Sequence, residues 1–229
     1  TTITDINCNA ASDGTATAIM TGGSSTTFTY NWDNFQVTQT ATGLDVGNYT
    51  VTVTNGNNCS FITSANIIEP SAVAITITPT NILCNGDANG AVNLTVSGGT
   101  PIYTFDWSTG VTAEDIIAPV GGTYIVTVTD GNNCTAAASA TVTEPMALTV
   151  TNTPVDASCS GVSDGSITLN VAGGSTAYSY DWTNGATTIA VTGLFAGNYS
   201  PTTTDANGCT NIQNIVITEL QLITLTPKI

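Results

Sequence analysis

The sequence lacks histidine and arginine, and it has one lysine, Lys228, against 16 acidic residues. General acid–base catalysis most often uses His, and Schiff-base chemistry needs Lys, so both reactions lack their usual residues. Paired carboxylates remain, but Asp106 and Asp181 are replaced by Asn31 in the first of three sequence repeats. We therefore expect no enzymatic activity.

The scarcity of positive charge also excludes classes of partner. Binding to a nucleic acid needs clustered Lys and Arg, and a net charge of −15 repels phosphate. The same sign argues against anionic membrane surfaces. No apolar run reaches 18 residues, so we expect no insertion into a membrane.

Cysteines and aromatic residues recur with a period of about 75 residues, which predicts three copies of one domain. Each copy has two cysteines, one Trp, one Tyr in a common position and a closing Glu. In chain order these are Cys8, Cys59, Cys84, Cys134, Cys159 and Cys209, then Trp32, Trp107 and Trp182, then Tyr49, Tyr124 and Tyr199, then Glu69, Glu144 and Glu219.

Within a copy the apolar residues alternate with polar ones, which is typical of half-buried β-strands. In the second copy the pattern covers residues 92–96, 103–107, 124–128 and 138–142, with turn sequences at 98–101 and 130–133. This predicts an all-β protein of three tandem immunoglobulin-like antiparallel β-sandwich domains, with one disulfide in each.

We expect the cysteines to pair within each copy, as Cys8 with Cys59, Cys84 with Cys134 and Cys159 with Cys209. Each bond would close a loop of about 50 residues and stabilise a small domain by about 4 kcal/mol. There is no Cys-x-x-Cys motif and no His, so zinc sites lack ligands. Disulfides persist outside the cytoplasm, so we expect an extracellular or cell-surface protein.

The ordered motifs resemble the SprB-type repeat of Bacteroidetes cell-surface adhesins. In the second copy these are CNGDANG at 84–90, SGGTP at 97–101, YTFDW at 103–107, GTYIVTVTD at 122–130, Cys134 and Glu144-Pro145. The resemblance covers all three copies and implies long secreted fibres concerned with attachment and gliding. The third copy departs from the pattern, because Pro201 stands at a core Val position and cannot donate to a strand ladder.

The predicted domains are residues 1–70, with an incomplete opening strand, 71–145 and 146–220. Residues 221–229 then form an orphan strand in which Leu222, Ile223 and Leu225 are the candidate donor residues. Strand donation of this tail to the first domain of the next copy would give a head-to-tail homopolymer. The alternative is that the chain is a slice of a longer repeat array.

No cofactor is expected, and calcium is the one metal candidate. Asp87, Asn89 and Asp164 lie in Gly-rich loops with alternating oxygen ligands, which hard cations prefer. Asp-Gly and Asn-Gly are also common turn sequences, and we favour that interpretation.

Threonine is abundant, at 46 of 229 residues. We expect Thr52, Thr54, Thr127 and Thr129 to face solvent. They are candidates for O-linked glycans, although Thr also suits exposed strand positions in general. Asn48 and Asn198 begin Asn-x-Ser/Thr sequons.

The aromatic residues alternate with polar ones, so we expect them on the core face of the sandwich and not on a sugar-binding platform. They are Phe28, Tyr30 and Trp32, Tyr103, Phe105 and Trp107, and Tyr178, Tyr180 and Trp182. The function predicted is a structural subunit of an extracellular filament or adhesive fibre. The alternative is an adhesin arm that binds a glycan or a protein through its loops.

Overall fold

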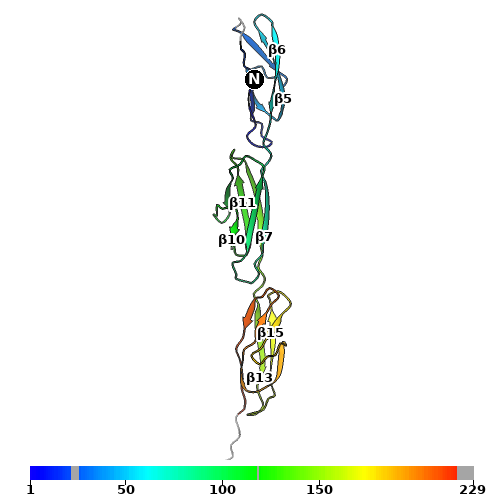
Figure 1. Ribbon diagram of the computed structural model, residues 1–229, viewed down its shortest axis with the longest axis vertical. Coiled ribbons are helices and arrows are strands. Elements are labelled where there is room, and N and C mark those ends of the chain that lie inside the picture. The colour runs from blue at the N-terminus through cyan, green and yellow to red at the C-terminus, as the bar shows by residue number, and fades with distance from the viewer. Residues whose placement is uncertain (22–25, 118, 221–229) are drawn as a thin grey trace, which may run out of the picture. The chain divides into compact units, whose positions relative to one another are not determined.

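The computed structural model describes residues 1–21, 26–117 and 119–220, and within these ranges the regular elements are all β-strands, with no helix. Each of the three repeats folds as an immunoglobulin-like antiparallel β-sandwich of short strands (Figure 1). The predicted fold class is therefore confirmed, except for the positions of the disulfides.

The first repeat has two three-stranded sheets, in the orders β1-β2-β4 and β3-β5-β6. All of their pairings are antiparallel. The strands are β1 (Thr2–Thr4), β2 (Gly14–Thr17), β3 (Phe28–Trp32), β4 (Thr40–Leu44), β5 (Gly47–Asn55) and β6 (Ser60–Ile67).

The second repeat follows the same plan, with sheets in the orders β10-β8-β7 and β12-β11-β9. Four of its strands match the alternating segments of the sequence, and this prediction is confirmed. The strands are β7 (Ala74–Thr80), β8 (Ala91–Ser97), β9 (Thr104–Trp107), β10 (Ile116–Ile117), β11 (Gly122–Thr129) and β12 (Thr135–Val142).

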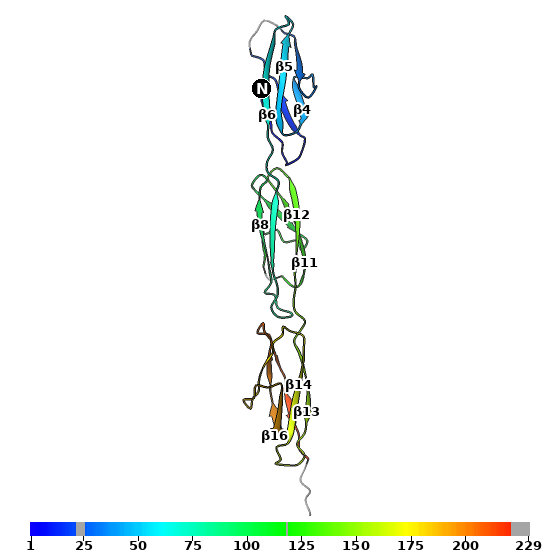
Figure 2. The same cartoon turned by 90° about the vertical axis from the view of Figure 1, so that its right-hand side faces the viewer.

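The third repeat has one sheet in the order β13-β14-β16, in which β13 and β14 run side by side (Figure 2). Its other sheet is divided into β15-β18-β19 and β17-β20. The strands are β13 (Thr149–Val155), β14 (Gly165–Ala172), β15 (Ser179–Asp181), β16 (Ala190–Leu194), β17 (Gly197–Tyr199), β18 (Thr202–Thr204), β19 (Thr210–Ile212) and β20 (Ile215–Ile217).

Pro201 interrupts the strand of the third repeat that is continuous as β11 in the second. β17 ends at Tyr199 and β18 begins at Thr202, because proline has no N–H to give to the ladder. The neighbouring strand, to which β17 and β18 are hydrogen-bonded, is divided as well, into β19 and β20. The strand is therefore broken at Pro201, where the sequence of the third copy departs from that of the second.

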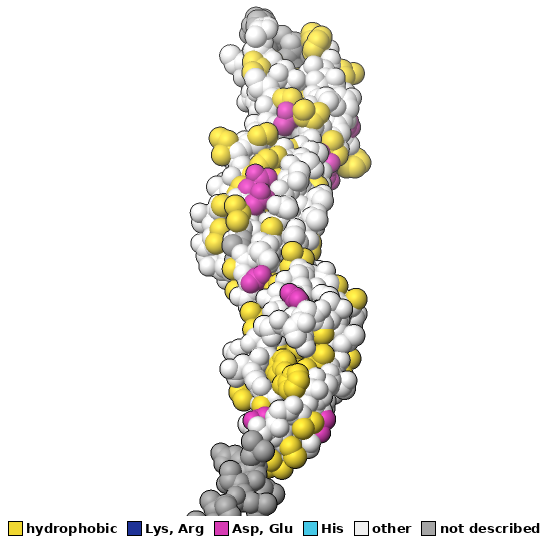
Figure 3. Space-filling view, turned by 60° about the horizontal axis from the view of Figure 1, so that its bottom comes forward, with side chains coloured by type: hydrophobic (Ala, Val, Ile, Leu, Met, Phe, Trp, Pro, Cys, Tyr) yellow, Lys and Arg dark blue, Asp and Glu magenta, His cyan; other side chains and the backbone are white. Residues whose placement is uncertain are grey.

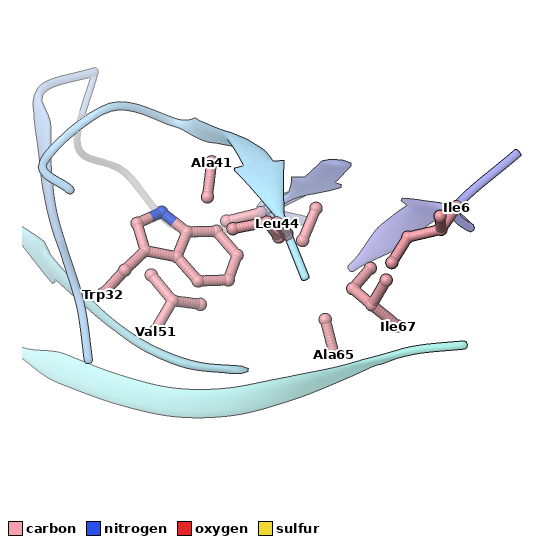
Figure 4. Packing of buried hydrophobic residues seen from close by; sticks show 9 residues of the cluster. Ile6, Trp32, Ala41, Leu44, Val51, Ala65 and Ile67 are labelled. Atoms are coloured by element: carbon pink, nitrogen blue, oxygen red, sulfur yellow. The ribbon is translucent and has the colours of Figure 1, made fainter. Parts of the chain in front are cut away.

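The core of each repeat forms around its Trp, which is 1% or 2% exposed. In the first repeat Trp32 lies in one buried cluster with Leu44, Val51 and Ile67 from three further strands (Figure 4). Each indole N–H also donates to a main-chain carbonyl six residues later, at 2.8 or 2.9 Å. The aromatic residues two and four positions before each Trp are half-buried. These aromatic residues therefore belong to the core, as the alternation in the sequence predicts.

The chain divides into two compact units. One comprises Thr1–Thr78, Asn93–Ile116 and Tyr124–Ala140, and the other comprises Pro79–Val92, Ile117–Thr123 and Thr141–Ile229. The division passes through the second repeat, so parts of that repeat are grouped with each neighbour. The predicted boundaries at residues 70, 145 and 220 stay predictions, and the candidate donor residues Leu222, Ile223 and Leu225 lie outside the described residues.

The core of the third repeat contains a defect at Thr203, which the Thr203→Val variant removes. Thr203 is fully buried, and its Oγ1 has no hydrogen-bond partner among the described residues. The matching residue of the second repeat is the fully buried Val128. Since an unpaired buried hydroxyl costs about 1–3 kcal/mol, the variant should raise the free energy of unfolding by about 1 kcal/mol, measured by urea unfolding.

The control is Thr203→Ser, which keeps the hydroxyl and removes a buried methyl. It should lower the stability of the protein. If Thr203→Val were the less stable of the two, the hydroxyl would have to be paired.

Candidate functional site: disulfides between repeats

The first cysteine of every repeat lies in a tight turn after the opening strand, which we call the cysteine turn (residues 7–13, 83–89 and 158–164). An acidic or amide side chain closes each turn by accepting a main-chain N–H from six residues earlier. Asp13 accepts from Asn7 at 3.1 Å, Asn89 from Leu83 at 3.3 Å and Asp164 from Ser158 at 2.9 Å. The three turns therefore have one common structure.

The second cysteine ends a turn between two strands, which we call the cysteine hairpin (residues 55–59, 130–134 and 205–209). In the second repeat Asp130 Oδ1 accepts the N–H of Asn132 at 2.9 Å and of Cys134 at 2.8 Å. Its Oδ2 accepts the N–H of Thr100 at 2.8 Å. Asp205 forms the same three bonds in the third repeat, with Ser175, Asn207 and Cys209. A single carboxylate thus fixes the cysteine and the neighbouring loop.

The structure contains two disulfides, and each joins a cysteine turn to the cysteine hairpin of the following repeat. Cys8 is bonded to Cys134 and Cys84 to Cys209, each with a Cα–Cα distance of 5.6 Å. Each disulfide lies within one of the two compact units. In the chain-entropy description, closing a loop of this length stabilises the fold by about 5 kcal/mol.

An asparagine side chain forms a hydrogen bond beside each disulfide. Asn132 Nδ2 donates to the carbonyl oxygen of Asn7 at 2.9 Å, directly before Cys8 in the sequence. Asn207 Nδ2 donates in the same way to the carbonyl oxygen of Leu83 at 2.8 Å, directly before Cys84. Both junctions therefore have the same hydrogen bond beside the same disulfide.

The predicted pairing within each repeat is wrong, and the reason is the length of the strand between the two cysteines. Cys59 immediately precedes β6, whereas the turn of Cys8 is held at the far end of that strand, where Ile6 N–H donates to Ile68. Eight residues of strand span about 27 Å, far beyond the 7 Å that a disulfide allows between Cα atoms. In this chain Cys59 and Cys159 are free and exposed.

The sequence contained a signal against pairing within a repeat, although it does not name the correct partners. In every repeat the second cysteine and the closing Glu bracket one alternating segment, which has to run the length of a domain. The first cysteine is close to that Glu in space, since Glu69 accepts the N–H of Ala10 at 2.6 Å and Glu219 that of Gly161 at 3.1 Å.

The calcium candidates act as turn-forming groups in this structure. Asp87 Oδ2 accepts from Asn89 Nδ2 at 3.2 Å, and Asp164 lies in the matching turn of the third repeat. The structure thus does not bring the three together. Over the described ranges there is no group of three or more His, Cys, Asp or Glu arranged to hold a metal.

The candidate glycosylation sites lie at accessible positions. Thr127, Asn48 and Asn198 are exposed, and Thr52, Thr54 and Thr129 are half-buried. Thr127 alternates along β11 with the buried Val126 and Val128, as expected.

On the face drawn in Figure 3, acidic side chains lie in separate spots among uncharged ones. No helix in the described chain is long and apolar enough to cross a membrane.

Comparisons with known proteins point to one family. The sequence model of the SprB repeat matches residues 1–37, 76–112 and 151–187. No curated protein matches the chain.

Among solved structures, the chain is similar to the N-terminal eight immunoglobulin domains of Down Syndrome Cell Adhesion Molecule, at 13% identity and a TM-score of 0.44. The alignment covers 95% of this chain and 36% of that one, so this chain spans just over a third of its length. A Salmonella alpha-2-macroglobulin reacted with methylamine aligns at 9% identity and a TM-score of 0.21, over 86% of this chain and 21% of that one. The fold assignment rests on strand pairing and core composition.

The cross-repeat pairing predicts a specific peptide map. Because the chain has one lysine and no arginine, pepsin is the suitable protease. A digest without reductant should yield peptides that join Cys8 to Cys134 and Cys84 to Cys209. Denatured protein should contain two free thiols, at Cys59 and Cys159. A peptide joining Cys8 to Cys59 would contradict the structure.

The hairpin aspartates predict a loss of stability in acid. Main-chain hydrogen bonds hold the pKa of Asp130 and of Asp205 below the usual value, with the largest effect from the N–H of Thr100 and of Ser175 respectively, while burial of the carboxylates opposes the shift. A carboxyl with a lowered pKa stabilises the fold above its unfolded pKa of about 3.9 and loses this effect as the pH falls through the folded pKa.

The double variant Asp130→Asn, Asp205→Asn should therefore lose less stability than the wild type between pH 7 and pH 2.5, measured as the urea midpoint at each pH. In the first repeat Asn55 already occupies this position and accepts the N–H of Asn57 and of Cys59. The double variant Asp106→Asn, Asp181→Asn, at exposed strand positions, removes the same two charges; it is the control for the change in net charge and should keep the wild-type pH dependence.

Proposed function

The chain carries three SprB repeats, and from this premise we propose that it is a load-bearing segment of an extracellular adhesive fibre. The observation that carries the proposal is that both disulfides join successive repeats. A bond inside one domain strengthens only that domain, whereas a bond between repeats also holds the two together. Disulfides of this kind persist outside the cytoplasm, which supports a location outside the cell or at its surface.

The overlap of the two disulfide loops limits how far the chain can be stretched. A covalent path leads from Cys8 to Cys134, back along the chain to Cys84, and through the second bond to Cys209. Tension therefore passes through residues 1–8, 84–134 and 209–229. The two longer segments, 8–84 and 134–209, carry no tension because the disulfides connect across them. Pulled by its two ends, the bonded chain reaches about 270 Å, against about 800 Å for the same chain without disulfides.

We include in this proposal the homopolymer and the covalent glycans expected from the sequence. The exposure of Thr127, Asn48 and Asn198 supports attachment of glycans to the surface of a fibre that has few charges. Strand donation concerns residues 222, 223 and 225, outside the described part of the chain.

Single-molecule pulling tests the load-bearing role. With handles at Thr1 and Ile229, the oxidised protein should reach a limiting extension near the shorter of these two lengths. The variant Cys8→Ser, Cys84→Ser has the same repeats without the cross-links and should extend about three times as far. An oxidised wild type that extends as far as this variant would rule out the proposal.

A further inference from the structure

The two free cysteines lie in the same local structures as the four that are paired. We propose that Cys159 of one copy of this chain forms a disulfide with Cys59 of a second copy, repeating between chains the bond seen twice within the chain. This goes beyond the proposed function, because a load-bearing segment needs no covalent bond between copies.

The hairpin of Cys59 has the backbone of the paired hairpins. Asn55 N–H donates to the Cys59 carbonyl at 3.0 Å, as Asp130 does to Cys134 at 2.9 Å. The residue before the cysteine has a positive φ in both, 62° at Asn58 and 65° at Asn133. Asn55 Oδ1 accepts the N–H groups of Asn57 and Cys59. Asp130 Oδ1 accepts the equivalent N–H groups in the second repeat. Cys59 is therefore already in the conformation in which Cys134 is bonded.

The turn of Cys159 likewise has the form of the paired turns. Val162 N–H donates to the Cys159 carbonyl at 3.1 Å, and Asp87 N–H donates to the Cys84 carbonyl at the same distance. The intervening glycines, Gly161 and Gly86, have φ values of 79° and 83°. No rearrangement is thus needed for Cys159 to act as Cys84 does.

The hydrogen bond beside each disulfide also has its donor and acceptor in place. Asn57 occupies the position of Asn132 and Asn207 and is exposed. Ser158 occupies the position of Asn7 and Leu83, whose carbonyl oxygens accept from those amides. In the linked copies Asn57 Nδ2 donates to the Ser158 carbonyl oxygen, which orients the two thiols toward each other.

The surface next to Cys59 adds an apolar area for the second copy. A hollow of about 440 Å³ lies there, lined among others by Ile19, Met20 and Phe61. The side chains of Ile19 and Phe61 are 53% and 73% exposed. A docked copy that covers part of them would gain from the burial of apolar surface.

The bond forms by thiol–disulfide exchange with a small disulfide oxidant, here oxidised glutathione. One cysteine thiolate attacks the oxidant, which gives a mixed disulfide and releases one glutathione thiolate. The second cysteine thiolate then attacks the protein sulfur of the mixed disulfide and releases the second glutathione. The two thiols are oxidised, the oxidant is reduced, and the two thiol protons pass to the released glutathiones.

The pairing joins unlike surfaces, a cysteine turn on one copy and a cysteine hairpin on the other. A contact of this type leaves the same two surfaces free at the ends of each assembly, so it builds chains of copies. Hairpin with hairpin, or turn with turn, lacks the match between amide donor and carbonyl acceptor. The proposal therefore excludes efficient pairing of Cys59 with Cys59 or of Cys159 with Cys159.

Two single variants of the full chain, Cys59→Ser and Cys159→Ser, test this rule. Both residues are exposed and unpaired in this chain, so each variant should keep the fold. In oxidised glutathione the wild type should give a ladder of oligomers on a gel without reductant. Each variant alone should stay monomeric, and an equal mixture should give one dimer band whose peptic map joins Cys59 to Cys159.

Homodimers of either variant that form as fast as the mixed dimer would overturn the proposal, as would a wild type that remains monomeric. The same digest should still show the bonds of Cys8 and Cys84 within each chain. Because the pulling experiment uses single molecules, failure of this test leaves the load-bearing role standing.

A further variant, Asn57→Ala, tests the docking contact. It removes the amide donor and keeps the main-chain hydrogen bonds of the hairpin, so it should slow formation of the mixed dimer by about 2- to 10-fold. The rate at which iodoacetamide labels Cys59 is the control and should not change. An unaltered rate of dimer formation would show that the amide does not take part in docking.

Discussion

The structure depends on the separation of the two cysteines of a repeat by one full-length strand. Cys59 precedes the eight-residue strand β6, and the turn that holds Cys8 lies at the other end of that strand. The two sulfur atoms of one repeat therefore lie at opposite ends of its sandwich and cannot bond to each other, whereas Cys8 meets Cys134 of the following repeat. Because of this strand length, the disulfides form between successive repeats and not within one. The same two disulfides therefore stabilise the domains and connect them.

Local hydrogen bonding prepares both partners before any sulfur reacts. The carboxylate of Asp130 or Asp205 holds its cysteine, a neighbouring amide and a loop from another part of the same repeat. In the first repeat Asn55 holds its hairpin through the same two local contacts, although its cysteine is free. The shape of the hairpin is thus a property of the repeat, and the disulfide adds a covalent bond to an existing conformation.

The third repeat shows how much irregularity the sandwich tolerates. Pro201 divides one strand in two, and Thr203 places an unpaired hydroxyl in the core, yet Trp182 stays buried and keeps its indole hydrogen bond. The Trp core and the junction contacts persist where the strand ladder is broken. The third repeat therefore keeps both its buried core and the contacts at its junction with the second repeat, although its strand ladder is interrupted.

The sequence alone determined the period, the strands, the turns and the core, because alternation and turn residues act over a few neighbouring positions. Trp32, Val126 and the hairpin at Asp130 lie where those patterns place them. The partners of the cysteines were decided only by the tertiary structure. Spacings of 50 or 51 residues fit pairing within a repeat, and those of 125 or 126 fit pairing across repeats. Sequence distance does not reveal which end of a sandwich a residue occupies, and a disulfide forms only between sulfur atoms that the fold brings to the same place.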